Sequence, residues 1–386
     1  MPTANENMEL ALAARRELSD QNPVEMILKS QAARPVAPEP PASREVSVRE
    51  VARLAKVSPA TVSLVINDNP RISSATKQRV RRVMEELGYR PNRLAQNLSR
   101  RDTQMLAVML PPLSHAFADR YFGELLSGIS DRARARGFKV MMEQSTPEFI
   151  GERKHLDLFE RRFVDGVLCL GNSDNHPFLT DFAAGNYPAI VVNNYFPQWP
   201  QLDHVVCDYR GGAEQAMNYL LQLGHRRIGI ITGSNRVQTA RDVVDAYEAK
   251  LREAGIEPLP TWREDGLFTE AGGADAAHKL LARHPDLTAI LAGNDKMAIG
   301  ALHYLSHTDK RVPQDISVVG FDDMEHAAYV KPTLTSVHTP LYEAGVLACE
   351  KLVNRIRGGA TGAGDVVRAV LPTHLIVRES TAIAPG

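Results

Sequence analysis

Residues 46–67 read VSVREVARLAKVSPATVSLVIN, and this stretch decides the fold of the N-terminal part of the chain. Ser47 followed three residues later by Glu50 has the spacing of a capping box at a helix start. Apolar residues then recur at helical spacing: Val48, Val51, Ala52, Leu54 and Ala55. After a break, Ser58 and Pro59 fit an N-cap followed by proline at the first helical position. The pattern predicts two short helices, the second running to about Asn67.

A third helix is predicted to start after the loop NDNPRIS. Ser73 or Ser74 can cap its start, and Gly88 is placed to end it. Its apolar stripe is Ala75, Val80, Val83, Met84 and Leu87. Three short helices, with a turn of a few residues between the first two, are typical of a helix-turn-helix. We therefore assign residues 46–90 to a DNA-binding domain.

The charge of the chain is unevenly distributed. Its formal net charge is −1, but residues 46–104 hold twelve Lys and Arg against five Asp and Glu. That segment therefore carries +7, and the remainder carries −8. A basic segment attached to an acidic body indicates that one end of the chain binds a polyanion.

Two segments flank the helix-turn-helix. Residues 1–45 include the Pro/Ala-rich stretch RPVAPEPPAS, which disfavours a packed core, so we expect a disordered N-terminal extension. Residues 91–104, PNRLAQNLSRRDTQ, form a hinge and linker. Positions 92–98 have room for two helical turns, and a helix that short needs a partner in order to form.

The pattern changes at residue 105, where short apolar runs begin to alternate with helical stretches. Such alternation predicts βαβ units and parallel sheets, and its length suits two doubly wound lobes over residues 105–386. The predicted strands are 106–110, 139–143, 166–170, 189–193, 228–232, 288–292 and 316–320. The predicted helices are 122–136, 212–223, 240–254, 272–283 and 296–306. In such sheets a ligand binds beyond the carboxyl ends of the strands.

Motifs of common enzymes are missing from the sequence. It contains no P-loop, no G-x-G-x-x-G after a strand, no G-x-S-x-G and no H-E-x-x-H. The three cysteines, Cys169, Cys207 and Cys349, are scattered and form no C-x-x-C pair, so we expect neither a disulfide framework nor a metal site. We predict no catalytic residues and no cofactor. The absence of a signal peptide and of a long apolar run favours a cytoplasmic, nucleoid-associated protein.

The N-terminal stretch, continued by GYRPNRLAQNLSRR, resembles the DNA-binding head and hinge of the LacI/GalR family of bacterial transcription repressors. The family's signature is matched at Val51, Ala52, Ala55, Val57, Ser58, Thr61, Val62, Ser63, Ile66 and Asn67. The resemblance extends over about residues 46–380 and includes LGHRRIGIITG, AGNDKMAIGAL, VPQDISVVGFDD and KPTLTSV. It implies a helix-turn-helix domain joined to a two-lobed body like that of periplasmic binding proteins.

The resemblance implies how the head meets DNA. The second helix enters the major groove with Pro59, Ala60 and Leu64 toward the bases. Ser58, Thr61, Ser63 and Asn67 can hold phosphates. Leu64 cannot make the bidentate contact to guanine that an arginine makes, so it either touches a thymine methyl group or packs within the head. Specificity then depends more on the hinge and on DNA deformability.

The hinge resembles the family's minor-groove helix, with DNA contacts at Asn92, Arg93, Ala95 and Leu98. In relatives the leucine equivalent to Leu98 inserts into a central base step and kinks the duplex. The small Ala95 lets two hinge helices approach each other. The alternative is a plain linker. A paired hinge implies a homodimer on a pseudo-palindromic operator.

The resemblance also places an effector between the lobes, with contacts from Tyr121, Phe122, Arg241, Phe268, Asn294, Asp295 and Asp322. Asp295 can instead cap a helix. The chain departs from the family at Val243, where relatives commonly have an arginine, and Arg241 lies two residues earlier. We expect a repressor controlled by a sugar-like effector. The alternatives are a sugar-binding protein or a sugar-processing enzyme with an appended DNA-binding head.

Overall fold

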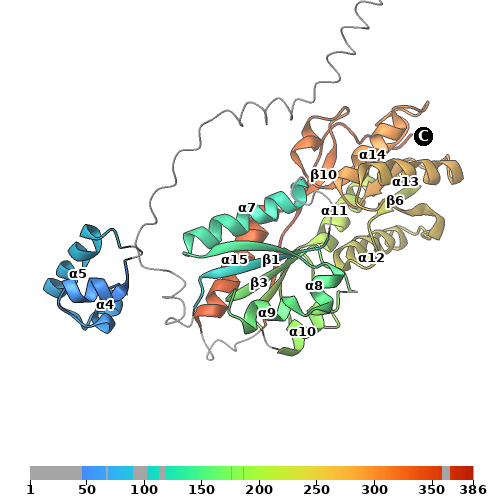
Figure 1. Cartoon of the computed structure of the whole chain (residues 1–386). Helices are drawn as coiled ribbons and strands as arrows, with labels where there is room; N and C mark the ends of the chain where they lie inside the picture. Colours follow the sequence, from blue (N-terminus) through green and yellow to red (C-terminus); the bar gives the residue numbers. More distant parts are fainter. Residues whose placement is uncertain are drawn as a thin grey trace, which may run out of the picture. The chain divides into compact units, whose positions relative to one another are not determined.

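The computed structural model of the chain describes residues 46–66, 68–89, 102–112, 119–174, 176–185, 187–358 and 366–385 (Figure 1). The chain divides between Ser99 and Arg100 into two compact units. We call the first unit the head and the second the body. This division agrees with the predicted organisation of a small helical domain followed by a larger α/β body.

The head consists of the helices α3 (Val48–Leu54), α4 (Pro59–Ile66) and α5 (Ser74–Glu86). Each helix starts at a serine whose hydroxyl accepts a hydrogen bond from a backbone N–H three residues later, as expected of an N-cap. These serines are Ser47, Ser58 and Ser73. Gly88 has a φ of +62° directly after the last helix, a conformation that glycine adopts without strain. Both the caps and the stop were therefore predicted correctly.

The core of the head is small and aliphatic, and it is formed by Val51, Ala52, Ala55, Val62, Val65 and Val80. Val48, Val83, Met84 and Leu87 are partly buried and pack against this core. Two other members of the predicted apolar stripes do not contribute to it. Leu54 is 45% exposed, and Ala75 is exposed as well. Each lies about a third of a turn from the buried face of its helix, at roughly 100° per residue. The predicted stripes were therefore too wide at these two positions.

The body contains two six-stranded sheets. The first sheet has the order β11-β5-β4-β3-β1-β2, and all its strand pairs are parallel. Its strands are β1 (Met105–Leu110), β2 (Lys139–Gln144), β3 (Gly166–Leu170), β4 (Ala189–Val192), β5 (Asp203–Cys207) and β11 (Arg368–Leu371). We call this sheet and its helices the N-terminal lobe.

The second sheet has the order β12-β10-β9-β8-β6-β7 and defines the C-terminal lobe. Its strands are β6 (Ile228–Thr232), β7 (Arg263–Asp265), β8 (Ala289–Ala292), β9 (Ser317–Asp322), β10 (Thr335–His338) and β12 (His374–Ile376). Four of its five strand pairs are parallel, and the edge strand β12 pairs antiparallel with β10. The predicted pair of doubly wound parallel sheets is confirmed, with β12 as the exception.

Helices cover both sheets. Those of the N-terminal lobe are α7 (Arg120–Ala135), α8 (Pro147–Gly151), α9 (Lys154–Glu160), α10 (Phe178–Gly185) and α15 (Leu341–Arg357). Those of the C-terminal lobe are α11 (Tyr209–Gln222), α12 (Gln238–Glu253), α13 (Glu270–Arg283), α14 (Asp295–Leu305) and the short 3-10 helices Pro260–Trp262 and Glu325–Ala328. No helix in the described part of the chain is long and apolar enough to cross a membrane.

The helices α7 and α15 pack side by side although they are far apart in the sequence (Figure 1). Gly128 on α7 and Gly345 on α15 allow this approach, because a Cβ on either residue would overlap the backbone of the other helix. A similar pair of glycines, Gly273 and Gly300, lies where α13 packs on α14. Glycine at these positions is explained by the close approach of two backbones.

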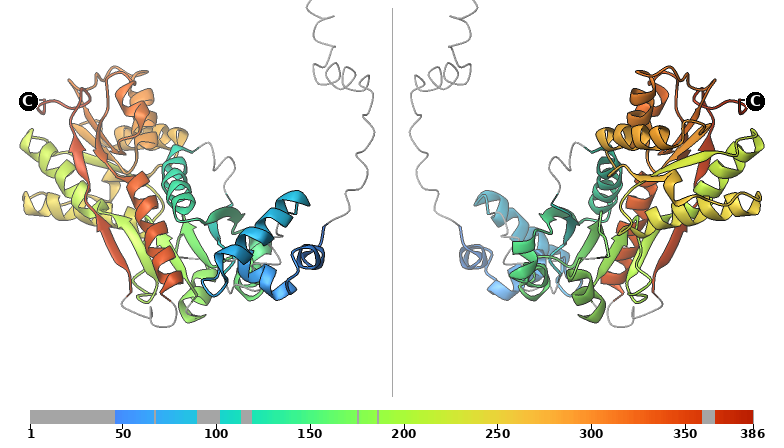
Figure 2. Two further views of the ribbon diagram at one scale, coloured as in Figure 1. Left: turned by 90° about the vertical axis from the view of Figure 1, so that its left-hand side faces the viewer. Right: turned by 90° about the vertical axis from the view of Figure 1, so that its right-hand side faces the viewer.

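The chain passes between the lobes three times. The crossings follow β5, β10 and β11, at Asp208, Thr339 and Pro372. Two of them are joined directly, since Asp208 N donates to the carbonyl oxygen of Leu371 at 2.8 Å and Thr373 Oγ1 donates to that of Asp208 at 2.9 Å. Figure 2 shows β11 and β12, in red, running one after the other along one edge of the body. Hydrogen bonds therefore join two of the three segments that connect the lobes.

Candidate DNA interface and effector cleft

The helix α4 presents a polar first turn and an exposed face. Ser58 Oγ accepts a hydrogen bond from Thr61 N at 3.0 Å and lies 2.9 Å from Thr61 Oγ1. Val62 and Val65 hold the opposite face of α4 in the core of the head. The three residues predicted to face bases are all exposed: Pro59, Ala60 and Leu64. Ser63 is half-buried.

Leu64 is 37% exposed and is not part of the buried core of the head. Its exposure favours the prediction that it meets the DNA over the alternative that it packs within the head. The base contacts themselves stay predictions. Asn67 and the hinge residues Asn92, Arg93, Ala95 and Leu98 lie outside the described residues, so their roles also stay predictions.

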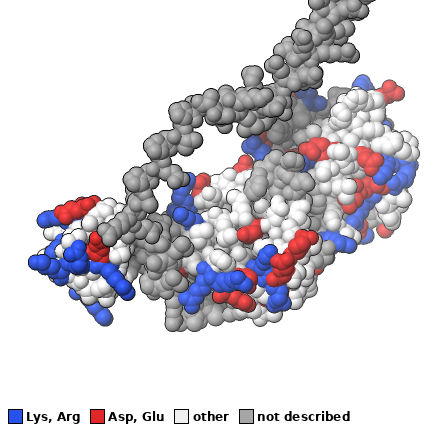
Figure 3. Space-filling model, in the orientation of Figure 1, with Lys and Arg blue, Asp and Glu red and all other residues white. Residues whose placement is uncertain are grey.

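The basic residues of the head lie at its surface. Figure 3 shows lysine and arginine side chains over much of the head's visible described face. Asp68 takes up two of these charges, with Lys77 Nζ at 3.0 Å and Arg81 Nη2 at 2.9 Å from its Oδ1. The hydrogen bond from Lys77 and its charge hold the pKa of Asp68 below its usual value. Other cations of the head, among them Arg53, Arg79 and Arg82, are exposed, and exposed cations can bind phosphates.

In the body, the predicted effector residues follow the carboxyl ends of strands. Tyr121 and Phe122 start α7 after β1, Arg241 lies on α12 after β6, and Phe268 follows β7. Asn294 and Asp295 follow β8, and Asp322 is the last residue of β9. Because the carboxyl ends of parallel strands meet at one edge of a sheet, these residues gather where the two lobes face each other.

A chain of hydrogen bonds connects two of the predicted residues across the cleft. Asn193 Nδ2 donates to Tyr121 OH at 3.1 Å and to Tyr209 OH at 2.9 Å. Tyr209 OH in turn donates to Asp322 Oδ1 at 3.3 Å, and Thr339 Oγ1 donates to the same oxygen at 3.1 Å. The sequence analysis missed Asn193, Tyr209 and Thr339, although each directly or nearly follows a strand. Asp322 therefore lies at the junction of the lobes.

Asp322 is a buried carboxyl group, 8% exposed. Burial raises its pKa to about 7, and the negative charge of Asp119 adds to the shift. The hydrogen bonds from Thr339 and Tyr209 act in the opposite direction. These two bonds engage only Oδ1. A polyol in the cleft would offer hydroxyl donors to the other carboxylate oxygen, which is the chemistry expected of a sugar site.

We predict that Asp322 makes the body less stable as the pH rises toward 7. The unfolded carboxyl group loses its proton near 3.8, whereas the folded one keeps it up to about 7. Between these values the folded state binds more protons, so the free energy of unfolding falls by at most about 1.4 kcal/mol per pH unit and then levels off.

The measurement is urea unfolding of the wild type and of Asp322→Asn between about pH 5 and about pH 8. The amide does not titrate, so the stability of the variant relative to the wild type should rise with pH in this window. A difference that stays constant over the whole range would show that Asp322 titrates alike in the folded and unfolded states.

Phe268 and Asn294 lie beside each other at one wall of the cleft. The ring of Phe268 lies against Gly233, where a Cβ would overlap it. Asn294 Oδ1 accepts from Met297 N at 2.8 Å and caps α14. The cap that the sequence analysis offered as an alternative role for Asp295 therefore belongs to Asn294. Asn294 therefore caps the start of α14, and its Nδ2 lies 3.5 Å from the carbonyl oxygen of Phe268.

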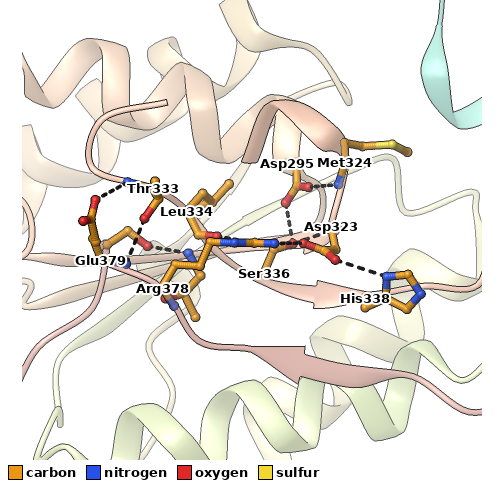
Figure 4. A network of polar contacts seen from close by, with 11 residues as sticks. Asp295, Asp323, Met324, Thr333, Leu334, Ser336, His338, Arg378 and Glu379 are labelled. Carbon is orange, nitrogen blue, oxygen red and sulfur yellow. Dashed lines mark hydrogen bonds and ion pairs between the residues drawn. The ribbon is translucent and has the colours of Figure 1, made fainter. Parts of the chain in front are cut away.

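Asp295 and Phe122 support the cleft from behind. Asp295 is 1% exposed, and its oxygens accept from Ser336 Oγ at 2.5 Å and Met324 N at 2.6 Å (Figure 4). Phe122 is 6% exposed and packs under Gly171 in the N-terminal lobe. Both side chains are buried in the absence of a ligand, as Asp322 is at 8% exposure, and their effector contacts stay predictions. Burial raises the pKa of Asp295 well above its usual value.

Asp323 anchors the strand end that carries Asp322. Its oxygens pair with Arg378 Nη2 at 2.6 Å and His338 Nδ1 at 3.2 Å (Figure 4). Arg378 also donates to the carbonyl oxygen of Leu334 at 2.7 Å. The C-terminal segment therefore ties the ends of β9 and β10 together next to the crossing at Thr339.

Ion pairs join the lobes at the edges of the cleft. Lys296 Nζ lies 3.1 Å from Asp119 Oδ2, and Arg120 Nη1 lies 2.7 Å from Glu325 Oε2. At α12, Arg241 reaches the N-terminal lobe. Val243, where the sequence analysis expected a departure from the family, is 3% exposed and packs in the core. The departure itself stays a prediction.

A cavity of about 390 Å³ opens at the carboxyl ends of β6 and β7. It is lined by Thr232, Gly233, Asn235, Pro260, Arg263, Glu264 and Asp265. A neighbouring cavity of about 590 Å³ shares Pro260 and Arg263 with it. Within the described ranges no group of three His, Cys, Asp or Glu side chains could hold a metal ion.

A helix-turn-helix head joined to a two-lobed body, with polar groups gathered between the lobes, defines a DNA-binding regulator with a ligand-binding domain. Comparisons with known proteins agree. Residues 47–92 match the model of bacterial regulatory proteins of the lacI family. Residues 217–381 match the periplasmic binding protein-like domain.

Relatives align over nearly their whole length. The transcriptional repressor CytR of Escherichia coli K12 is 32% identical over 88% of this chain and 97% of its own. The regulator CelR of Thermobifida fusca is 35% identical over 87% of this chain and 98% of its own. The chain belongs to the lacI family of bacterial regulatory proteins. The relatives in these comparisons are transcription regulators rather than enzymes.

Solved structures show the same architecture. A lac repressor dimer bound to operator and an anti-inducer matches with a TM-score of 0.76 at 26% identity, over 88% of this chain and 100% of that one. A complex of CelR with cellobiose matches with a TM-score of 0.67 at 32% identity, over 87% of this chain and 99% of that one. The predicted fold of a head and a two-lobed body is confirmed.

Proposed function

We propose that the chain is a homodimeric repressor that binds a pseudo-palindromic operator and is controlled by a small sugar-like effector. One α4 from each protomer enters a major groove, and the paired hinges bind the minor groove between them. The similarity to a lac repressor dimer bound to operator supports this arrangement. A protein with this task works in the cytoplasm, at the nucleoid.

The observation that carries the effector proposal is the position of Asp322. Its carboxylate lies at the junction of the lobes, and hydroxyl groups of this chain already donate to one of its oxygens. Tyr121 is connected to Asp322 through Asn193 and Tyr209. Together with the proposed contacts Phe268 and Asn294, it would supply the aromatic and amide groups that suit a sugar face and its hydroxyls. A relative of this chain, CelR, has been solved with cellobiose.

We further propose that the effector is an inducer. Its binding changes how the lobes sit on each other, and the hinges then lose the arrangement that DNA requires. Because the two sites are linked, the operator must lower the affinity for the effector by the same factor by which the effector lowers the affinity for the operator. A corepressor would give the opposite sign in both measurements.

The operator proposal is tested by fluorescence anisotropy with a duplex selected from a random pool. We expect affinity to fall steeply with salt, by roughly a thousandfold between about 50 and 200 mM if six or more phosphates are contacted. The control is a scrambled duplex of equal length. Equal affinity for both duplexes, or affinity independent of salt, would contradict the proposal.

The effector proposal is tested by a thermal-shift screen of cellobiose, other sugars, sugar acids and purines against the full chain. A ligand at about 100 times its dissociation constant stabilises the body by roughly 2.7 kcal/mol. The same ligand should then release the operator in the anisotropy assay. A stabilising ligand that tightens operator binding would identify a corepressor instead.

A further inference from the structure

Two consecutive residues of α12 reach across the cleft to the N-terminal lobe. Arg241 Nη1 lies 3.0 Å from Asp174 Oδ2. Tyr195 OH donates to Asp242 Oδ2 at 2.9 Å and lies 3.0 Å from Oδ1. Asp174 follows β3 and Tyr195 follows β4, so both partners belong to the other lobe.

Gln238, one turn before this pair on α12, joins the two contacts. Its Oε1 accepts from Arg241 Nη2 at 2.7 Å, and its Nε2 donates to Asp242 Oδ1 at 2.9 Å. The five side chains therefore form one continuous network that begins and ends in the N-terminal lobe. We call it the α12 clasp: Asp174, Tyr195, Gln238, Arg241 and Asp242.

The surroundings of the clasp strengthen it. Beside it, Asp174 N donates to the carbonyl oxygen of Arg236 at 3.0 Å, a backbone hydrogen bond between the lobes. Burial raises the pKa of Tyr195 to about 12 and that of Asp242 above its usual value. Tyr195 therefore keeps its proton at neutral pH and remains a donor. Partly buried charged groups lose less to solvent screening than exposed ones.

Other charged pairs on α12 do not cross the cleft. Glu248 pairs with Arg252 at 2.8 Å, and Lys250 pairs with Glu253 at 2.8 Å, each within the helix itself. Among these charged side chains of α12, the ones that contact the N-terminal lobe therefore lie in the first turns of the helix.

We propose that the α12 clasp holds the two lobes together at this edge before any effector arrives, and that opening of the cleft must break it. The clasp sets how much of the body's population is open without ligand. Only the regulatory role of the clasp rests on the proposed function, because the effector would act by shifting the balance between open and closed lobes. The clasp itself requires neither effector nor operator.

The test is hydrogen–deuterium exchange of the full chain, followed at the amide of Asp174, whose hydrogen bond joins the lobes. Tyr195→Phe removes one hydroxyl, and Arg241→Gln removes one charge, without a large change in volume. We expect each to speed exchange at this amide by roughly three- to tenfold, and the double variant by roughly ten- to a hundredfold, as for the net loss of one ordinary hydrogen bond or partly exposed ion pair in each single variant.

Two further variants separate the clasp from general destabilisation. Arg252→Gln breaks a pair on the same helix that stays within one lobe, so exchange at Asp174 should not change. Arg241→Lys keeps a cation near Asp174 and should restore most of the protection. Exchange at Asp174 within twofold of wild type in the double variant, or an equal effect of Arg252→Gln, would overturn the proposal.

The failure of the clasp and the failure of the proposed function give different results. If exchange responds as expected while no operator is selected, the clasp stands and the repressor proposal falls. If the operator is bound and released by a sugar while exchange at Asp174 does not respond, the repressor stands and the lobes are held by other contacts, such as Lys296 with Asp119.

Discussion

Replacing Gly128 by alanine is expected to destabilise the body by about 3 kcal/mol or more, because the new methyl group has no room. Its Cβ would lie 2.9 Å from Val346 N and closer still to the carbonyl oxygen of Tyr342. Both are backbone atoms of α15, so no side chain can rotate away. Relief requires α7 and α15 to separate, and that separation would disturb the helices that cover the N-terminal sheet.

The measurement is thermal unfolding of the full chain, and we expect the transition of the body to fall by roughly 6–12 °C, at about 2–4 °C per kcal/mol. Gly123→Ala is the matched control, since Gly123 lies on the same helix and nothing lies within 4 Å of its added Cβ. There alanine should stabilise by up to about 1 kcal/mol through its higher helix propensity. Equal shifts for the two variants would mean that the helices do not pack at Gly128.

Gly345→Ala offers an independent check from the other side of the same contact. Its Cβ would overlap the carbonyl oxygen of Leu125 and lie 3.1 Å from Ile129 N. The loss should be similar in size to that of Gly128→Ala. Combining the two substitutions should cost less than the sum of the single losses, because one separation of the helices relieves both overlaps.

Most of the strands that the sequence predicted are buried central strands, although the predicted β2 is a partly exposed edge strand. The buried strands β5 and β10 were missed, and each of them begins with two polar residues. β1, β3, β6 and β8 consist almost entirely of apolar residues, which is typical of central parallel strands. β7 reads RED and consists only of polar residues. β7 becomes a strand only because β6 pairs with it at the edge of the sheet. No local pattern could have revealed it.

Long-range placement explains the other misses. α15 has an amphipathic sequence, but only the crossing at Thr339 places it on the N-terminal lobe, far from its neighbours in sequence. β11 and β12 are adjacent in the chain and belong to different sheets. Which sheet a short segment joins depends on tertiary contacts, and a single sequence does not contain that information in a local form.

The candidate site divides in the same way. The resemblance to the family placed Tyr121 and Asp322 in the predicted effector site. It did not reveal that Asn193 and Tyr209 join them, or that Asp295 turns inward to Ser336. The distinction between lining a cleft and supporting it depends on the direction of a side chain. A residue that lines the cleft and one that supports it can have the same residue type and the same position after a strand, so the sequence does not separate them.

Replacing Leu98 by alanine is expected to weaken binding to the selected operator by roughly ten- to a hundredfold. The resemblance to the family makes Leu98 the wedge that unstacks a central base step, and the cost of unstacking, a few kcal/mol, is recovered only through contacts that the kink allows. Alanine is too short to hold the step open. Phosphate contacts made by the head are unaffected, so binding to scrambled DNA should hardly change.

The comparison of the two duplexes therefore decides the role of Leu98. Leu54→Ala is the matched control, because Leu54 is an exposed leucine of the head outside its core. It should leave the ratio of specific to scrambled binding unchanged. If Leu98→Ala lowered both affinities equally, the residue would act as part of a plain linker. The side chains of Pro59, Ala60 and Leu64 cannot hydrogen-bond bases. If they face the major groove as predicted, we expect discrimination to depend on bending the DNA.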